Sequence, residues 1–124
     1  MIRLILVIDD DQGIRDIIRF ALEPVGWQVK TAPSGHEGLI QAQAQPPDAI
    51  LLDVTMPDLD GYTVAHRLRS QATTQNIPII LLTARVQGHT PQQLAELKVA
   101  GVITKPFRVR ELADKVKKLL QWTD

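Results

Sequence analysis

The chain has 124 residues, enough for one domain with its own hydrophobic core but too few for two domains of ordinary size. It contains no cysteine, which excludes disulfides, zinc–thiolate sites and thiol catalysis. Its formal net charge of zero gives no reason to expect nucleic-acid or membrane binding. The first apolar stretch, residues 4–8, is too short for a signal peptide or a membrane span, so we expect a cytoplasmic protein.

The first half of the chain alternates between short apolar runs and segments with helical spacing. Gly26 follows the first helical segment as a C-terminal cap, and Ser34 with Glu37 forms a capping box that opens the second. Leu39 and Ile40 are expected to be the main apolar anchors of this second helix. The pattern predicts strands at residues 3–8, 27–32 and 49–52, and helices at residues 14–25 and 34–44.

The second half continues the same alternation. Pro78 lacks an amide donor and should lie at the start of its strand, while Thr90 and Pro91 combine a cap residue with a proline at the first helical position. The pattern predicts helices at about residues 61–71, 90–98 and 109–120, and strands at residues 77–82 and 101–104. No repeat or linker divides the chain, so we expect residues 1–124 to form a single domain.

Five strands that alternate with five helices predict an α/β fold, with a parallel sheet covered by helices on both faces. Right-handed crossovers bring the carboxyl ends of all strands in such a sheet to one edge, where ligands bind. The residues at these predicted strand ends are polar: Asp9, Asp10, Asp53, Thr83 and Lys105. We therefore expect side chains from four distant segments to converge on one pocket.

Asp53 is the centre of this predicted set, although a single carboxylate after a strand would more often stabilise a turn or cap a helix. Together with Asp9 and Asp10 it would meet strong repulsion, about 4 kcal/mol for a unit pair 4 Å apart at an effective dielectric near 20. A hard divalent cation relieves this repulsion, so we expect Mg²⁺, with Mn²⁺ as a possible substitute. Carboxylates, a hard cation, Lys105 and a hydroxyl suit phosphoryl transfer, for which the obvious nucleophile is a carboxylate.

The remaining side chains give little support for another chemistry. His36, His66 and His89 do not lie at predicted strand ends, and no pair of them has metal-ligand spacing, so we expect them at the solvated surface. The basic residues of the last helix are interpreted as its solvated face, because no aromatic platform for nucleic acid interleaves them. Trp27 and Trp122 are expected to be packing residues.

Four segments at predicted strand ends carry a more specific signal. They read LVIDD at residues 6–10, LDVTMPDLDG at 52–61, LTA at 82–84 and TKPF at 104–107. Together, and in this order, they resemble the receiver domain of two-component response regulators over essentially the whole chain. The resemblance implies a flavodoxin-like, doubly wound sheet with strand order 2-1-3-4-5.

The resemblance also implies how a phosphoryl group is handled. Asp53 would accept it from a phosphohistidine of a sensor histidine kinase or a histidine phosphotransfer protein. Thr83 would hydrogen-bond a phosphoryl oxygen, and Lys105 would pair with the group electrostatically. The family places a cis peptide bond before the proline of this motif, so the Lys105–Pro106 bond is expected to be cis.

A second set of roles implied by the resemblance concerns the metal. Asp10, Asp53 and the backbone carbonyl of Thr55 would coordinate Mg²⁺ directly, and Asp9 would act mainly through metal-bound water. Asp11 lies one position beyond the acidic pair of the family, and we interpret it as a helix-start residue.

Three positions depart from the family pattern or vary within it. Many receivers have an aromatic residue three positions before the lysine, whereas this chain has Val102 there, so an aromatic rotamer switch cannot operate. Thr55 and Arg85 flank the presumed phosphorylation site at variable positions and are expected to tune the lifetime of the phosphoryl group. We expect Arg85 to face solvent.

The resemblance implies a protein that catalyses only its own phosphorylation and dephosphorylation and is not otherwise an enzyme. We expect no effector domain, and therefore output through a downstream protein partner, as a monomer or a weak phosphorylation-linked dimer. The usual output surface of the family comprises the fourth and fifth helices and the strand between them. Its polar residues in this chain are Gln92, Gln93, Arg108, Arg110 and Lys115.

Three rival interpretations remain open on the sequence. A non-phosphorylated pseudo-receiver would share the fold but would not need the complete polar set. A small aspartyl-phosphatase would use an Asp-x-Asp after the first strand, for which Asp9 and Asp11 offer the spacing, but the short chain leaves no room for a cap domain. A flavodoxin-like cofactor binder would place a phosphate where three carboxylates would repel it.

Overall fold

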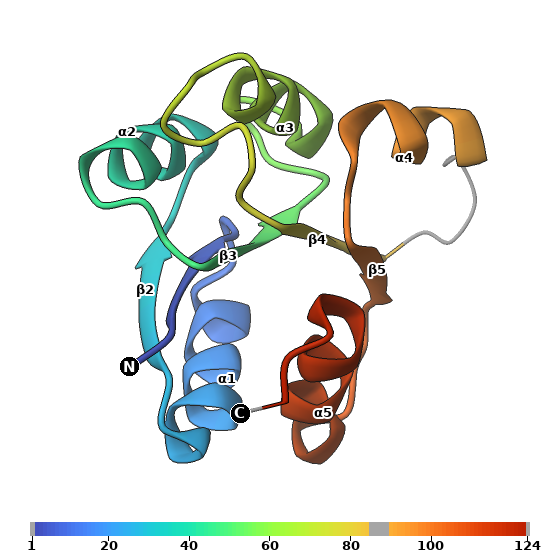
Figure 1. The fold of residues 1–124 in the computed structure, drawn as a ribbon. Coiled ribbons are helices and arrows are strands. Elements are labelled where there is room, and N and C mark those ends of the chain that lie inside the picture. Colours follow the sequence, from blue (N-terminus) through green and yellow to red (C-terminus); the bar gives the residue numbers. More distant parts are fainter. Residues whose placement is uncertain (1, 85–89, 124) are drawn as a thin grey trace.

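The computed structural model describes residues 2–84 and 90–123, without the side chain of Gln93, and within these ranges five strands alternate with five α-helices (Figure 1). The strands are β1 (Leu4–Ile8), β2 (Gln28–Ala32), β3 (Ala49–Asp53), β4 (Ile79–Thr83) and β5 (Gly101–Thr104). The α-helices are α1 (Gln12–Leu22), α2 (Gly35–Ala44), α3 (Gly61–Arg69), α4 (Pro91–Leu97) and α5 (Val109–Leu120), and a short 3₁₀ helix, η1 (Glu23–Val25), follows α1.

All neighbouring strands of the sheet are parallel, in the order β2-β1-β3-β4-β5. This confirms the predicted doubly wound α/β fold and its strand order. The chain passes from β1 to β2 on one side of β1 and then crosses to β3 on its other side, so the direction of the strand order reverses between β1 and β3. Ligands of such sheets bind beyond the carboxyl ends of the strands at this switch point, and the carboxyl ends of β1 and β3 carry Asp9 and Asp53.

Helices cover both faces of the sheet, with α1 and α5 on one side and α2, α3 and α4 on the other (Figure 1). Alternate residues of each strand enter separate cores. In β1, Ile5 and Val7 pack with α1 and α5, whereas Leu6 and Ile8 pack with α2 and α3. Burial on both faces explains why the central strands read as continuous apolar runs rather than alternating ones.

The first two helices differ from the sequence prediction in detail. The α-helix that was expected to reach residue 25 ends at Leu22, because Pro24 has no amide to donate, and η1 continues the turn. Gly26, at φ 101°, caps η1. The expectation that Ile40 anchors α2 is wrong, since its side chain is 67% exposed. Leu39 and Ala42 are the buried apolar side chains of this helix.

The remaining elements lie close to their predicted positions. In α5, Leu112 and Val116 are buried as expected, but Val109 at the start of the helix is exposed. His36 and His66 are at the surface as expected, and His89 lies outside the described residues. Across the described ranges, each helix falls short of the length and apolar character that crossing a bilayer requires.

Candidate functional site

Three carboxylates meet at the carboxyl edge of the sheet, as the strand-end pattern predicts. Asp9 and Asp10 follow β1 and Asp53 ends β3, and each offers an oxygen that lies within 4.8 Å of an oxygen of the other two. Asp9 is fully buried and Asp53 is 5% exposed, whereas Asp10 faces solvent. Two desolvated negative charges side by side are costly unless a positive group lies between them.

Lys105, which directly follows the edge strand β5, supplies that positive group. Its Nζ lies 2.8 Å from Oδ2 of Asp9 and 3.2 Å from Oδ1 of Asp53. The amide of Lys105 donates to the carbonyl of Thr83 at 2.7 Å, which holds its backbone beside the end of β4. The Lys105–Pro106 peptide bond is cis, as expected. One lysine therefore bridges two carboxylates that are 44 residues apart in the chain.

The proton affinities of this cluster follow from its burial. Burial of the carboxyl group, and then repulsion by Asp9, raise the pKa of Asp53 from 3.8 to about 6, although Lys105 and the amide of Thr55 act in the opposite direction. Burial lowers the pKa of Lys105, but its hydrogen bonds to Asp9 and Asp53 and their charges outweigh this and raise it above 10.5. At neutral pH the cluster thus contains an ionised but poorly solvated Asp53 beside a firmly protonated lysine.

Further contacts hold the buried Asp9 in place from its own side of the sheet. Its Oδ1 accepts a hydrogen bond from the amide of Asp11 at 2.9 Å, and its backbone carbonyl accepts one from Nη1 of Arg15 at 2.8 Å. Asp11 itself caps α1 by accepting from the amide of Ile14, which confirms its interpretation as a helix-start residue. The support from Arg15, which reaches back from the first turns of α1, was not foreseen from the sequence.

Thr83 ends β4 and is buried at the same edge, with Thr104 as its partner in the register of β5. Thr55 lies in the loop after β3, where its amide donates to Oδ1 of Asp53 at 3.4 Å. Val102 is half-buried against the core that α2, α3 and α4 share with the sheet. Arg85 lies outside the described residues, so the expectation that it faces solvent stays a prediction.

Comparison with known proteins identifies this arrangement. Residues 5–117 match the family model described as "Response regulator receiver domain". The chain belongs to this family. It is a receiver of two-component signalling with an acidic site of the magnesium-binding kind at its sheet edge.

Solved receivers share the fold over nearly their full length. The chemotaxis protein CheY4 of Vibrio cholerae has a TM-score of 0.89 and 28% identity, with 96% of this chain and 99% of that one covered. The receiver domain of a sensor histidine kinase from Pseudomonas aeruginosa PAO1 has a TM-score of 0.85 and 27% identity, covering 98% and 99%. In that protein a magnesium ion is coordinated in the active-site cleft.

Curated relatives are similar in sequence but longer. The DNA-binding dual master transcriptional regulator RpaA of Synechocystis is 40% identical over 97% of this chain and 50% of its own length. The alkaline phosphatase synthesis transcriptional regulatory protein PhoP of Bacillus subtilis is 39% identical over 98% of this chain and 50% of its own. The chain therefore spans about half the length of the curated relatives it matches.

The donor set of this receiver fits a hard divalent cation. Asp9, Asp10 and Asp53 can offer only oxygen ligands, and among the residues that the structure describes no softer sulfur or imidazole donor joins the cluster. With all three carboxylates ionised, Lys105 offsets one of three negative charges and leaves two. A divalent ion balances the two remaining negative charges. Leaving them uncompensated would be costly because Asp9 and Asp53 are buried.

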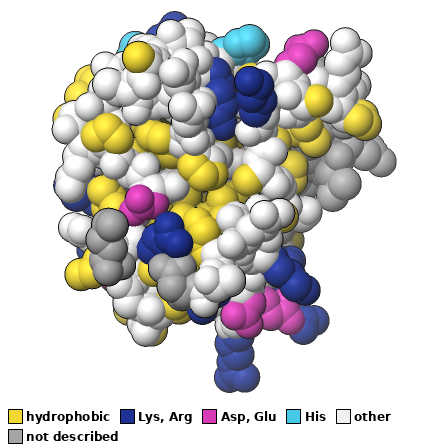
Figure 2. Space-filling view, in the orientation of Figure 1, with side chains coloured by type: hydrophobic (Ala, Val, Ile, Leu, Met, Phe, Trp, Pro, Cys, Tyr) yellow, Lys and Arg dark blue, Asp and Glu magenta, His cyan; other side chains and the backbone are white. Residues whose placement is uncertain are grey.

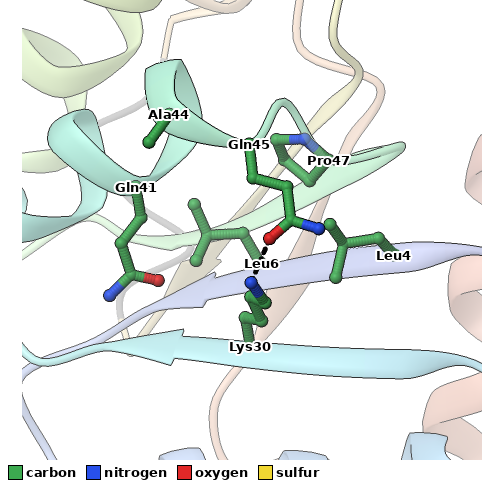
Figure 3. Close-up of a pocket in the computed structure, with 7 residues that line it drawn as sticks. All are labelled: Leu4, Leu6, Lys30, Gln41, Ala44, Gln45 and Pro47. Atoms are coloured by element: carbon green, nitrogen blue, oxygen red, sulfur yellow. Dashed lines mark hydrogen bonds between the residues drawn. The ribbon is translucent and has the colours of Figure 1, made fainter.

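A hollow of about 170 Å³ lies elsewhere in the receiver, between α2 and the strands β1 and β2 (Figure 3). Leu4, Leu6 and Pro47 form much of its wall, and Lys30 forms a hydrogen bond to Gln45 across it. Because Leu4 is the first residue of β1 and Pro47 lies just before β3, this hollow lies toward the amino ends of the strands, away from the carboxylates. Among the described residues that line it there is no acidic group, so it is not a candidate for the chemistry.

Proposed function

We propose that this receiver accepts a phosphoryl group from a phosphohistidine onto the carboxylate of Asp53, in a Mg²⁺-dependent phosphorelay. The observation that carries the proposal is the contact of Lys105 with Asp53 and Asp9, at 3.2 and 2.8 Å, at the switch point of the sheet. A carboxylate nucleophile, a fixed cation and an acidic metal site are the groups that phosphoryl transfer to an aspartate needs.

In the proposed step, a carboxylate oxygen of Asp53 forms a bond to phosphorus while the bond from phosphorus to the histidine nitrogen breaks. The electron pair of the broken bond stays on the imidazole, which takes up a proton from solvent. Asp53 can act as the nucleophile because a pKa of about 6 leaves it mostly ionised at neutral pH. Nζ of Lys105 is close enough to Oδ1 of Asp53 to pair with the incoming phosphoryl oxygens, and the Thr83 hydroxyl donates to one of them.

The proposed ligands of the metal are Asp10, Asp53 and the backbone carbonyl of Thr55, with Asp9 acting through metal-bound water. Bound Mg²⁺ supplies positive charge that offsets the charge developing on the phosphoryl oxygens. Mn²⁺ should substitute, since it also accepts carboxylate, carbonyl and water ligands. The solvent exposure of Asp10, beside two buried carboxylates, supports an entry path for the cation from the surface.

Membership of the family implies a cognate histidine kinase. We propose that the phosphoryl donor is a sensor histidine kinase or a histidine phosphotransfer protein in the cytoplasm. The output is proposed to be a contact with a downstream protein through α4, β5 and α5. Figure 2 shows basic side chains next to acidic ones at the lower right of the view, where Figure 1 has α5. At the start of α5, Nη1 of Arg108 lies 3.8 Å from Oε1 of Glu111. Mixed charge of this kind favours a protein partner over nucleic acid.

The rival phosphatase interpretation would need Asp11 as a partner of a nucleophilic Asp9. Oδ1 of Asp11 instead accepts from the amide of Ile14 at 3.2 Å as the cap of α1, and Oδ2 of Asp9 is engaged by Lys105. A pseudo-receiver, for its part, gains nothing from two buried carboxylates that raise a pKa and cost stability. Both observations support Asp53 as the acceptor.

The test is intact-mass measurement after incubation with Mg²⁺ and a small phosphodonor such as acetyl phosphate. We expect a gain of one phosphoryl group that disappears with EDTA and in Asp53→Asn. Asp114→Asn, the same change on the exposed face of α5, is the matched control and should be phosphorylated normally. No gain by the wild-type chain, or an equal gain by Asp53→Asn, would exclude Asp53 as the acceptor.

A further inference from the structure

The loop between β3 and α3, residues 54–60, is attached to a helix that precedes it in the chain. Oδ1 of Asp58 accepts a hydrogen bond from the amide of Gly35 at 3.1 Å, and Oδ2 accepts one from the amide of His36 at 3.0 Å. Both amides belong to the first turn of α2, where backbone N–H groups have no partner within the helix. A single carboxylate in the loop therefore binds two neighbouring donors of a distant helix end.

Close packing at the same junction supports this attachment. A Cβ atom on Gly35 would lie 3.0 Å from Cβ of Leu59 and 2.9 Å from Cγ2 of Val64, so the absence of a side chain at Gly35 lets the loop and α3 approach α2. Leu59 and Val64 belong to the core that the sheet shares with these helices. The hydrogen bonds of Asp58 and the apolar contact thus hold the same two segments together.

Capping of α2 alone does not account for Asp58. Ser34 is already the N-cap residue of α2, and its side chain accepts from the amide of Glu37 at 3.2 Å. The two caps engage different donors, and of these two caps only Asp58 connects the helix to the loop. The hydrogen bonds from the backbone amides of His36 and Gly35 lower the pKa of Asp58 and so favour its ionised form. The positive end of the α2 dipole favours the same charge.

The ends of this loop are fixed by separate contacts. At its start Asp53 is held in the sheet, and at its end the amide of Gly61 donates to the carbonyl of Val54 at 2.7 Å. A Cβ on Gly61 would lie 2.5 Å from the carbonyl oxygen of Asp53, so α3 begins in direct contact with the backbone of the site. Met56 points into the core. Asp58 is the polar anchor of the remaining turn.

We propose that Asp58 is a positioning residue of the receiver, which fixes the loop that carries the carbonyl of Thr55 by docking it on the first turn of α2. This inference rests on the proposed function, in which that carbonyl helps to hold Mg²⁺. Asp58 itself is not one of the carboxylates that meet at the candidate metal site. Its loss leaves the three carboxylates in place and lets the carbonyl of Thr55 move relative to them, which weakens the binding of Mg²⁺.

The experiment compares Asp58→Ala with Ser34→Ala in the full chain. Both variants remove a cap of α2, but only the first releases the loop. We expect Asp58→Ala to weaken Mg²⁺ binding, measured by titration calorimetry, by about fivefold, the factor that corresponds to the loss of one capping interaction. Its phosphorylation rate should fall at subsaturating Mg²⁺ and recover at saturation. Ser34→Ala should lose thermal stability and bind Mg²⁺ as tightly as the wild type.

A conservative variant separates positioning from folding. Asp58→Asn keeps an oxygen acceptor for one of the two amides, and asparagine is nearly equal to aspartate as a helix cap, so we expect a Mg²⁺ affinity within about twofold of the wild type. Amide hydrogen exchange of residues 54–60 should accelerate in Asp58→Ala and not in Ser34→Ala. This readout does not depend on phosphorylation.

The outcomes distinguish this inference from the proposed function. Equal Mg²⁺ affinity and equal loop exchange in Asp58→Ala and the wild type would overturn the positioning role, even if phosphorylation of Asp53 is observed. Equal losses of Mg²⁺ affinity in Asp58→Ala and Ser34→Ala would overturn it too, because α2 capping alone would then explain the effect. If the wild type binds Mg²⁺ but is not phosphorylated, the proposed function fails, while the affinities still decide the role of Asp58.

Discussion

The two ends of the strands carry different kinds of side chain: charged groups meet at the carboxyl edge of the sheet, and aromatic rings meet at the amino edge. At the carboxyl edge, Asp9 and Asp53 are buried beside each other and share Lys105 as a partner. At the amino edge, the rings of Trp27 and Trp122 pack edge to face with centroids 5.4 Å apart. Trp27 precedes β2 and Trp122 follows α5, so this contact ties the end of the chain to the start of a strand.

The comparison shows which contacts stabilise the fold and which destabilise it. Aromatic pairs in edge-to-face geometry stabilise beyond the area they bury. Buried like charges destabilise unless a partner or a cation compensates them. We therefore expect changes at the amino edge to lower stability and leave chemistry intact. At the carboxyl edge, changes should alter chemistry strongly, and some of them should raise stability.

The largest effect is expected for Lys105→Met, which removes the cation shared by Asp9 and Asp53. Phosphorylation by a small phosphodonor should slow by about a hundredfold, the usual cost of losing one electrostatic stabiliser of a transition state. The metal-free variant should also lose about 3 kcal/mol of unfolding free energy near pH 8, where both carboxylates lose their partner. Rapid-mixing rate measurements and urea denaturation test the two effects. Lys115→Met, on the exposed face of α5, is the control and should change neither.

The second prediction concerns pH and the charge of Asp53. Its pKa is about 6 in the folded, metal-free protein, whereas the ordinary pKa of an aspartate, as in an unfolded chain, is 3.8. Between these values the folded state holds a proton that the unfolded state has released, so ionisation costs stability as pH rises through this range. Above pH 6 the cost is complete, and it reaches at most about 3 kcal/mol.

The variant Asp53→Asn carries no such charge, so it should become more stable than the wild type as pH increases from about 4 to about 6, and the difference should then level off. Urea denaturation of both proteins in EDTA measures it. Mg²⁺ should reduce the difference, because it offsets the charge of the wild-type cluster. A stability difference that is constant across this range would show that burial and Asp9 do not raise the pKa of Asp53.

At the opposite edge, Trp122→Ala should cost about 2 kcal/mol, less than the loss of a fully buried tryptophan because this side chain is half-buried. Trp122→Phe should recover much of the loss, since a ring still meets Trp27. Urea denaturation followed by circular dichroism gives the stability. The phosphorylation rate should equal that of the wild type at temperatures where the variant is folded, and a slower rate would contradict the separation of the two edges.

Much of the site could be predicted because it depends on strand ends. Apolar runs that stop at Asp53, Thr83 and Lys105 place these residues at one edge as soon as the sheet is parallel, and local caps such as Asp11 and Asp60 follow short-range rules. Contacts between distant segments have no such pattern. Asp58 stands in a loop where nothing in the neighbouring residues indicates its partner, yet it caps a helix that begins 23 positions earlier.

Two other features show why the rest could not be read from the sequence. Ile40 fits an apolar position of α2, but the helix turns Leu39 and Gly38 toward the sheet: a Cβ on Gly38 would lie 2.4 Å from Cδ1 of Ile8. Arg69 at the end of α3 resembles an ordinary surface arginine, yet its guanidinium donates to backbone carbonyls of two other segments. These acceptors belong to Gln75, Ile77, Leu97 and Lys98. Only the packed tertiary structure decides both cases.

The smallest expected effect lies within the aromatic cluster at the amino edge. The guanidinium carbon of Arg3 lies 4.1 Å from the ring centroid of Trp122, within the range of a cation–π interaction. A double-mutant cycle with Arg3→Ala and Trp122→Ala should give a coupling free energy of about 0.5–1 kcal/mol, since the pair is only partly desolvated. The cycle is needed because Arg3 also has other interactions, which a single substitution would remove together with this one. A coupling near zero would assign the stability of this edge to the two tryptophans rather than to the cation above them.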